Sequence, residues 1–342
     1  MKKSIVIGSG FAGLSAASFL AKEGHQVTVL EKLSTPGGRA RQWKEQGFTF
    51  DMGPSWYWMP DIFDRYFSCF GKTTSAYYSL KRLDPSYRVY WDDSFTDIPA
   101  DYEAFRRLLE QWEPGSAQQL DRFLKEAAYK YRVGIQNLVF KPGLSWTEFI
   151  DWSVFKGALR LDVFTSIKKH IHHHFKHPKI RQLLEFPVLF LGALPDNTPA
   201  LYSLMNYADI VGGTWYPEGG MYGVVQGMYD LARELGVRFH FNEAVTHFDF
   251  TGNEIHRVHT PKGSYEADVI VGGADYAFIE NQLLPQQLQS YTPAYWDKRE
   301  MAPSCLLYYI GLNKRLKGIS HHMLFFDVPF APHAQEIYTT RR

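Results

Sequence analysis

Apolar and polar positions divide the chain into segments of two kinds, and their order predicts an α/β fold. Residues 4–7 and 27–30 are short, β-branched apolar runs, and the stretch between them is rich in Ala, Ser and Leu and has helical composition. Towards the other end of the chain, residues 224–235 predict a helix and residues 237–241 a strand. Further strands are predicted at 253–259, 263–266 and 268–271. Strands that alternate with helices are typical of a parallel sheet covered by helices.

The loop after the first strand carries Gly8, Gly10 and Gly13, which have the GxGxxG spacing of a dinucleotide site. Gly8 permits a tight turn, Gly10 leaves room for a pyrophosphate, and Gly13 lets the following helix lie close to the strand. The phosphates would meet free N–H groups at the N-terminus of that helix. A secretory signal, suggested by Lys2 and Lys3, is disfavoured because three glycines interrupt the apolar run.

Two further features strengthen the nucleotide-binding interpretation. The second strand ends in Glu31, whose carboxylate can accept hydrogen bonds from both ribose hydroxyls of an adenosine and would repel a 2′-phosphate. Six residues later, Gly37-Gly38-Arg39 forms a second glycine turn with a cation. Arg39 can pair with the pyrophosphate while the glycines let the backbone pass close to the cofactor.

The stretches GSGFAGL, VTVLEK and PGGR together resemble the FAD-binding N-terminus of the glutathione-reductase-like flavoproteins, in the branch of amine oxidases, protoporphyrinogen oxidase and carotenoid desaturases. Within that branch, GFTFDMGPSWYWMP from Gly47 and WYPEGGMYGVVQGM from Trp215 are most similar to bacterial-type phytoene desaturases (phytoene dehydrogenases). The resemblance extends from Lys2 to about Phe326. It implies FAD as the cofactor, bound by a discontinuous Rossmann-like domain with an inserted α+β substrate domain.

The resemblance also implies a set of cofactor contacts. The DMGP region is expected near the flavin ring, and Val245 is expected to meet the adenine through its backbone. The expected contacts are Gly8, Ser9, Gly10, Phe11, Ala12, Gly13, Glu31, Lys32, Gly38, Arg39, Gly53, Pro54, Ser55 and Val245. No catalytic residue is assigned, because Asp51, Asp209 and Glu218 are candidate bases near motifs and nothing in the sequence ranks them.

The long middle portion does not continue the alternation of strand and helix. Residues 102–131 are predicted to be mainly helical, with Pro114-Gly115 interrupting the helix, and residues 87–91 and 305–312 are predicted strands. A cofactor fold needs no such insertion, so a second domain that binds another molecule is indicated. The expected division is 1–71 and 215–300 for the FAD-binding domain, and 72–214 and 301–342 for a substrate-binding, membrane-facing domain.

The charges nearly balance, since 37 Lys and Arg face 36 Asp and Glu, so nucleic acid is not predicted as a partner. Aromatic residues make up 16% of the chain, which fits a large apolar ligand cavity and an aromatic-rich core equally well. Trp56, Tyr57 and Trp58 leave the same two alternatives open beside the flavin. Cys69 and Cys305 lack a CxxC spacing, indicate neither a disulfide framework nor a zinc site, and agree with a reducing cytoplasm.

Residues 168–181, KKHIHHHFKHPKIR, form the most polarised stretch. His170 and His174, like His173 and His177, are four residues apart, a spacing that can place two imidazoles on one helix face. No carboxylate or cysteine lies within the stretch and the resemblance implies no metal, so no metal site is predicted. The open alternatives are a solvated basic helix face and contact with an anionic membrane.

The longest apolar run, residues 186–194, contains a proline and is about half as long as a membrane-spanning helix requires. A transmembrane protein is therefore not predicted. Docking on one leaflet remains possible, with the basic stretch and the apolar run that follows it as the contact surface. The expected location is the cytoplasm, with peripheral attachment to a membrane.

The resemblance implies FAD-dependent desaturation of phytoene or a similar long polyene in carotenoid biosynthesis, by allylic hydride transfer to the flavin and loss of a proton. A polyene delocalises the developing cation, so the protein mainly has to supply an apolar tunnel, alignment and proton removal. Oxygen, a membrane quinone or another carrier would each suit this chemistry as the electron acceptor. The alternatives are a carotenoid isomerase or another carotenoid desaturase, an amine oxidase-like flavoenzyme, and an inactive flavin-binding fragment.

Desaturases of this group are longer and end in a third glycine-rich cofactor motif, which is absent from this sequence up to Arg342. The chain is accordingly expected to be the N-terminal part of a longer protein. Without that motif, weaker retention of FAD and an incomplete pocket for the flavin ring are expected.

Overall fold

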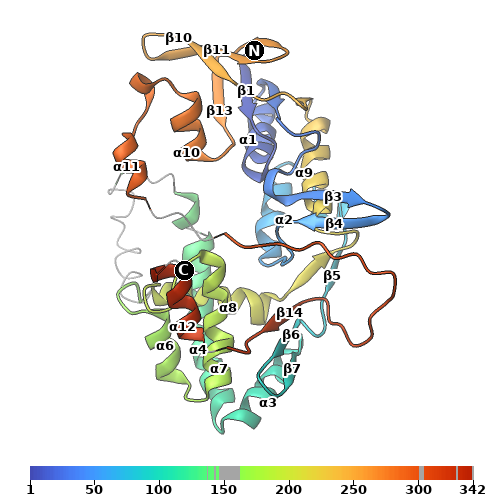
Figure 1. The fold of residues 1–342 in the computed structure, drawn as a ribbon, viewed down its shortest axis with the longest axis vertical. Coiled ribbons are helices and arrows are strands. Elements are labelled where there is room, and N and C mark those ends of the chain that lie inside the picture. The colour runs from blue at the N-terminus through green and yellow to red at the C-terminus, as the bar shows by residue number, and fades with distance from the viewer. Residues whose placement is uncertain (137, 142–143, 146–161, 300–303, 329, 341–342) are drawn as a thin grey trace. The chain divides into compact units, whose positions relative to one another are not determined.

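The computed structural model describes residues 1–136, 138–141, 144–145, 162–299, 304–328 and 330–340, which form two compact units (Figure 1). Unit 1 comprises residues 1–81 and 216–300, and unit 2 comprises residues 82–215 and 301–342. The first boundary thus follows residue 81, where the sequence suggested residue 71. The roles of the two units in binding cofactor and substrate remain predictions.

Unit 1 contains a four-stranded parallel sheet in the order β13-β1-β2-β9. Ile7, at the end of β1, lies opposite Leu30 of β2 and Gly272 of β13. The strands are β1 (Lys3–Ile7), β2 (Gln26–Leu30), β9 (Arg238–His240) and β13 (Val269–Gly272). The strands predicted at 4–7, 27–30, 237–241 and 268–271 are confirmed to within a residue or two. The predicted α/β class is confirmed by this sheet and its helices.

The two faces of this sheet are buried differently because side chains alternate along a strand. Val6 points to the side of α1 (Phe11–Lys22) and α9 (Tyr222–Glu234), which pack against each other. Ile5 and Ile7 point to the other side. That side is covered by the antiparallel strands β10 (His247–Thr251), β11 (Glu254–Thr260) and β12 (Gly263–Glu266). Burial on both faces explains why the central strands read as continuous apolar runs.

The remainder of unit 1 consists of short elements. Residues 41–52 form a hairpin, in which Gly47 adopts a positive φ of 81° between the two strands. Its strands are β3 (Arg41–Glu45) and β4 (Phe48–Met52), and the helices are α2 (Pro60–Ser68), α10 (Tyr276–Phe278) and α11 (Pro293–Asp297). The strands β5 (Leu80–Arg82) and β8 (Trp215–Pro217) lie where the chain passes between the units.

Unit 2 is mainly helical. The helix predicted for 102–131 is interrupted as expected, since α3 ends before Pro114 and Gly115 has a positive φ of 88°. The helices are α3 (Tyr102–Trp112), α4 (Ser116–Gln136), α6 (Ile167–His174), α7 (Pro178–Glu185), α8 (Leu204–Tyr207) and α12 (Phe330–Gln335). A small sheet has the order β14-β6-β7, with strands β6 (Tyr87–Tyr90), β7 (Phe95–Ile98) and β14 (Met323–Phe325).

The strand predicted at residues 305–312 is wrong. The segment is irregular, and the strand that joins β6 is β14, further along the chain. Leu306 and Ile310 are 77% and 70% exposed, and none of the strands that the structure describes pairs with this segment. An apolar run of this kind forms a β-strand only where a neighbouring strand completes its backbone hydrogen bonds.

No helix within the described ranges is long and apolar enough to cross a membrane.

Candidate cofactor site

The turn between β1 and α1 is closed by two glycines that admit no side chain. Gly8 has a positive φ of 93°, and its N–H donates to the Leu30 carbonyl at 2.8 Å. A Cβ on Gly13 would lie 2.0 Å from the Gly8 carbonyl oxygen. Gly10 differs, because a Cβ there would meet no atom within 4 Å. The turn is therefore tight where α1 meets β1 and open at Gly10, where the sequence places a pyrophosphate.

The N-terminus of α1 is available to an anion. Gly10 is the N-cap with an extended backbone, no side chain caps the helix, and its first turn contains no acidic residue. The first N–H groups of a helix have no partner within the helix, and the helix dipole favours negative charge there. These features fit the phosphates of a dinucleotide.

Glu31 is held beneath the same turn, with 4% of its surface exposed. Its Oε2 accepts hydrogen bonds from the backbone N–H and the hydroxyl of Ser9, both at 2.7 Å, and its Oε1 accepts one from the Leu33 N–H at 2.9 Å. A carboxylate offers about four acceptor positions. Glu31 thus fixes the glycine turn, and its remaining lone pair on Oε1 fits the predicted ribose contact.

The second turn lies against the first, and the third lies against the second. The Gly37 N–H donates to the Ser9 carbonyl at 2.8 Å, and a Cβ on Gly38 would come within 3.4 Å of the Gly10 Cα. A Cβ on Gly53, in the DMGP region, would lie 2.2 Å from the Arg39 carbonyl oxygen. Three stretches spread over 45 residues therefore meet in series, backbone to backbone. Glycine suits these positions because Gly53 leaves no space for a Cβ, and Gly37 and Gly38 have positive φ.

The other expected contacts lie around this point. Arg39, Lys32, Ala12, Pro54 and Ser55 are exposed. Lys32 lies over the Phe278 ring, with 6.0 Å from its Nζ to the ring centroid, and Phe11 packs on Phe63. The Val245 side chain is buried in the same core cluster as Ile7 and Leu30, which leaves only its backbone for a ligand.

Asp51, one of the candidate bases, is committed to the start of α9. Its Oδ2 accepts from the Tyr216 hydroxyl at 2.6 Å and the Met221 N–H at 2.7 Å, and its Oδ1 accepts from the Tyr222 N–H at 3.1 Å. Burial and this hydrogen bond raise the pKa of Tyr216 above its ordinary value. A Cβ on Gly220 would lie 2.8 Å from Asp51 Oδ2, which explains the glycine pair in WYPEGGM.

The two other candidate bases have contrasting surroundings. Asp209, in unit 2, is buried and accepts hydrogen bonds from the Tyr87 and Thr214 hydroxyls, both at 2.9 Å. Burial, with the Asp209 charge, raises the pKa of Tyr87 well above its ordinary value. Glu218, in unit 1, is exposed. Asp51 and Asp209 therefore have evident structural roles, and the sequence offered no signal for either because their partners are remote in the chain or are ordinary polar residues.

The aromatic run after the DMGP turn divides between core and surface. Tyr57 is buried, its hydroxyl is hydrogen-bonded to the Tyr78 hydroxyl at 2.9 Å, and its ring stacks on Phe63. Trp56 and Trp58 are half-buried and make an edge contact with centroids 5.4 Å apart. The structural interpretation therefore holds for Tyr57.

Only one of the two histidine pairs, His170 and His174, lies on a single helix. His170 and His174 both belong to α6. His177 lies beyond the end of that helix, because the capping residue Phe175 has an extended backbone with φ −131° and ψ 146°. The spacing argument for His173 and His177 therefore fails, since it assumed a continuous helix.

Comparison with known proteins gives a consistent result. The family described as flavin containing amine oxidoreductase matches residues 11–308. A carotenoid 3,4-desaturase of Haloarcula japonica is 36% identical over 97% of this chain and 68% of its own length. A zeta-carotene-forming phytoene desaturase of Myxococcus xanthus is 30% identical over 99% of this chain and 66% of its own length. The chain thus spans about two thirds of each relative.

The fold also matches solved structures. An oxidoreductase from Methanosarcina mazei superposes with a TM-score of 0.55, at 18% identity, over 86% of this chain and 64% of that protein. At this identity the likeness concerns the fold alone.

Proposed function

The chain belongs to the flavin containing amine oxidoreductase family, and on that premise we propose that it acts as an FAD-dependent desaturase of a long carotenoid-type polyene. The relatives named above are carotenoid and phytoene desaturases, and they are similar to this chain over nearly its whole length. In such a substrate, the reacting group is a C–C single bond flanked by double bonds, from which two hydrogens are removed.

One observation supports the cofactor assignment above all: the Gly37-Gly38 turn packs backbone to backbone on the Gly8–Gly10 turn at the open N-terminus of α1. In the proposal, Gly8, Gly10 and Gly13 accommodate the pyrophosphate, and Glu31 holds the turn while accepting from the ribose. Bound FAD would supply an acceptor for the hydride, one proton with two electrons, that leaves the C–H bond, and a second proton would then be lost to a base. Arg39, which is exposed beside this point, would pair with a phosphate.

The rest of the proposed chemistry asks for alignment and proton removal. Asp51 and Asp209 are occupied by hydrogen bonds to tyrosine, threonine or backbone groups, so neither is proposed as the base. Glu218 is exposed and follows β8, and it is the remaining candidate from the sequence. Its substitution by Gln would test this role through the pH profile of turnover.

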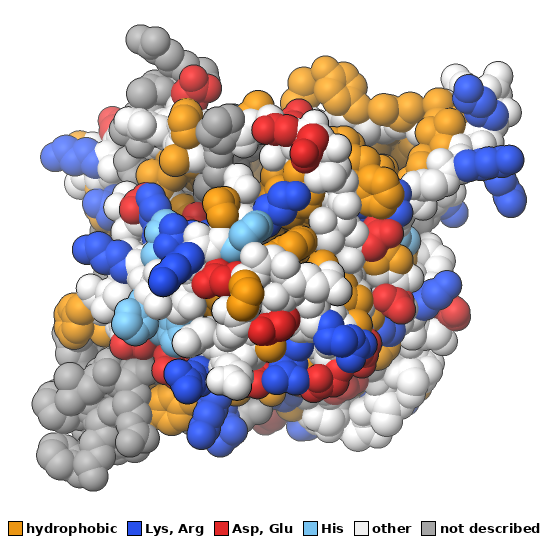
Figure 2. Space-filling model, turned by 90° about the horizontal axis from the view of Figure 1, so that it is seen from below, with side chains coloured by type: hydrophobic (Ala, Val, Ile, Leu, Met, Phe, Trp, Pro, Cys, Tyr) orange, Lys and Arg blue, Asp and Glu red, His pale blue; other side chains and the backbone are white. Residues whose placement is uncertain are grey.

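We also propose that the substrate is collected from a membrane surface and that a quinone or oxygen takes the electrons. Support comes from the substrate, which is apolar, and from unit 2, where Phe190 and Leu191 are exposed beside the basic stretch. A basic stretch followed by exposed apolar residues suits peripheral attachment to an anionic leaflet. On the face shown in Figure 2, lysine, arginine and histidine side chains are interspersed with acidic and hydrophobic ones.

The first experiment is the absorbance spectrum of the purified chain after addition of excess FAD and removal of unbound cofactor. Retained flavin is expected for the parent chain, and its loss is expected in Glu31→Arg. Glu45→Arg makes the same charge change at an exposed position of β3 and should keep the flavin. Turnover is then followed with phytoene in liposomes. A folded parent chain that keeps no FAD would overturn the cofactor assignment for this chain.

A further inference from the structure

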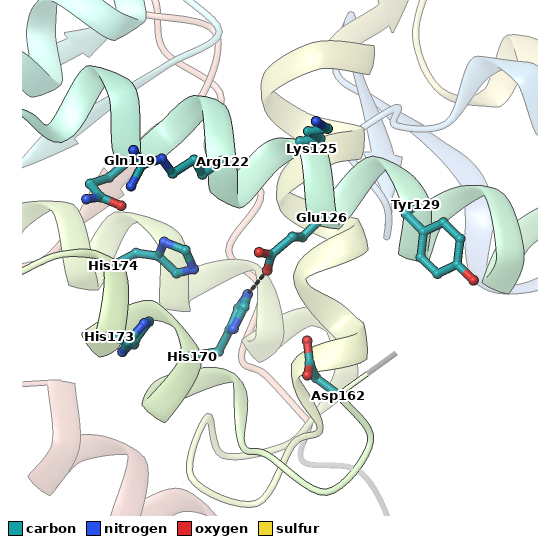
Figure 3. Close-up of a pocket in the computed structure, with 9 residues that line it drawn as sticks. All are labelled: Gln119, Arg122, Lys125, Glu126, Tyr129, Asp162, His170, His173 and His174. Carbon is teal, nitrogen blue, oxygen red and sulfur yellow. Dashed lines mark ion pairs between the residues drawn. The ribbon is translucent and has the colours of Figure 1, made fainter. Parts of the chain in front are cut away.

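Unit 2 contains a cavity of about 1090 Å³ to which the function proposed above assigns no role. Figure 3 shows the residues that line it, which belong to α4 and α6 or, in the case of Asp162, precede α6. The lining residues are Gln119, Arg122, Lys125, Glu126, Tyr129, Asp162, His170, His173 and His174.

Three of these side chains converge. His170 and His174 lie one turn apart on α6, and α4 packs against that helix and directs Glu126 towards them (Figure 3). One possible ligand atom from each of the three lies within 4.8 Å of the others. His170 Nε2 is 3.5 Å from Glu126 Oε2, and the two imidazole centroids are 5.0 Å apart. The carboxylate that the histidine stretch lacks is therefore supplied by another helix.

The two imidazoles are partly enclosed by apolar packing. The His170 side chain is 10% exposed, and the Phe123 ring lies 5.4 Å from His170 and 5.7 Å from His174, centroid to centroid. His170 Nε2 and His174 Nδ1 are buried without a hydrogen-bond partner within the part of the chain that the structure describes. A buried nitrogen without a hydrogen-bond partner destabilises the folded state, and a ligand that binds the nitrogen removes this cost.

From this geometry we propose that Glu126, His170 and His174 bind a divalent transition-metal ion of the zinc type. Two imidazole nitrogens and one carboxylate oxygen are a ligand set that suits Zn²⁺, with a fourth position open to water from the cavity. The bound ion would link α4 to α6 inside unit 2. Small rotations of the three side chains are required, because ligand atoms around one zinc ion lie closer together than 4.8 Å.

The neighbouring charges set the limits of this site. Lys130 is fully buried, but its charge is paired with Asp162 at 2.9 Å. Arg122 and Lys125 also line the cavity and oppose a cation.

A second group, His247, Asp249 and His259, serves as an internal comparison. It lies on the β10–β11 hairpin, where the two imidazole rings stack in parallel with centroids 4.2 Å apart. His259 Nε2 is already 2.8 Å from Asp249 Oδ2, and Asp249 also pairs with Arg257 at 3.6 Å. Asp249 is thus paired with both Arg257 and His259, which compete with a cation for its carboxylate, although His259 Nε2, like His170 Nε2, has no partner with hydrogen-bond geometry among the described residues.

The test is zinc binding by the full 342-residue chain, purified without a polyhistidine tag and stripped with a chelator. Titration with ZnCl₂ by calorimetry should show one site, and CoCl₂ should give the visible absorption of a four-coordinate ion. His170→Ala and His174→Ala should each weaken binding at least about tenfold, since even loss of an outer partner of a metal ligand costs that much. Glu126→Gln preserves the side-chain shape and should also weaken binding.

The controls lie on the same helix and in the other histidine group. His173→Ala removes an exposed histidine that lines the cavity outside the triad, and His247→Ala removes one from the hairpin. Both should leave the affinity unchanged, and circular dichroism establishes that each variant is folded. Absence of zinc binding, equal loss in His173→Ala, or retention in Glu126→Gln together with both triad histidine variants would overturn the proposal. So would binding of inorganic phosphate by the cavity in place of zinc.

Discussion

The glycine turns of unit 1 and the histidine cavity of unit 2 are assembled over similar distances in sequence, yet only the first is evident from the sequence. Gly8 and Gly53 are 45 residues apart, and Glu126 and His170 are 44 residues apart. In the turns, the backbone itself makes the approach, so positions such as Gly13 and Gly53 demand glycine. In the cavity, side chains make the approach, and a glutamate on α4 looks like any other helical acid. A site formed by close approach of the backbone is therefore recognisable from its glycines in the sequence. A site formed by side chains from distant segments is recognised only once the fold is known.

The largest expected effect is that of Gly13→Val. Its Cβ would lie 2.0 Å from the Gly8 carbonyl, so α1 must separate from β1. We expect a loss of more than about 3 kcal/mol in the free energy of unfolding, beyond ordinary overpacking. Denaturant unfolding measures it. Gly10→Ala is the matched control, because its Cβ meets no atom within 4 Å: it should fold normally but retain less FAD. Equal destabilisation by both changes would contradict the distinction between a packing glycine and a cofactor glycine.

Zinc binding should stabilise the folded chain through the histidine cavity of unit 2. At a free Zn²⁺ concentration of 100 times Kd, the folded chain should gain about 2.7 kcal/mol of stability if the unfolded chain does not bind the ion. Thermal unfolding with ZnCl₂ and with a chelator measures this gain. His174→Ala should abolish it, and His173→Ala should retain it. A gain that persists in His174→Ala would place the ion elsewhere.

Glu31→Ala should have a smaller effect than the glycine change. It leaves the Ser9 N–H and the Leu33 N–H without their acceptor in a buried turn. We expect destabilisation of about 2 kcal/mol, the usual cost of such unpaired groups. Glu31→Gln keeps an acceptor and should lose less, measured by denaturant unfolding. Equal stability of the parent and Glu31→Ala would show that the carboxylate does not hold the turn.

The smallest effect concerns Glu185, which accepts from His172 Nε2 at 2.8 Å outside the cavity lining. Burial raises the pKa of Glu185 above its ordinary value of 4.5. Its protonated form thus favours the folded state at low pH, and that contribution is lost as the pH rises through the folded pKa. Glu185→Gln cannot ionise, so its stability relative to the parent should increase from about pH 4.5 towards neutrality. Unfolding curves across this range give the sign, and a constant difference would contradict it.

Local features of the sequence were sufficient for much of unit 1. The strand ending at Ile7, the glycine spacing and the strand ending at Leu30 depend on residues close in sequence, and the structure has them where they were expected. The family resemblance then supplied the flavin and its oxidoreductase class, which agree with the comparisons.

Features that depend on distant partners could not be predicted. Asp51 was a candidate base, but it receives hydrogen bonds from residues about 170 positions later. The run 305–312 has strand composition and no strand paired with it among those described. His177 was assigned to the helix face of His173, and the helix ended first at His174. In each case the missing information was which part of the chain lies alongside.

The irregular run at 305–312 has a practical consequence for handling the protein. Extended apolar backbone that no strand covers is a template for edge-to-edge association between copies. Leu306, Tyr308 and Ile310 are each at least 70% exposed. Such exposure favours self-association of the purified chain, and Ile310→Lys would be the first solubilising change to introduce.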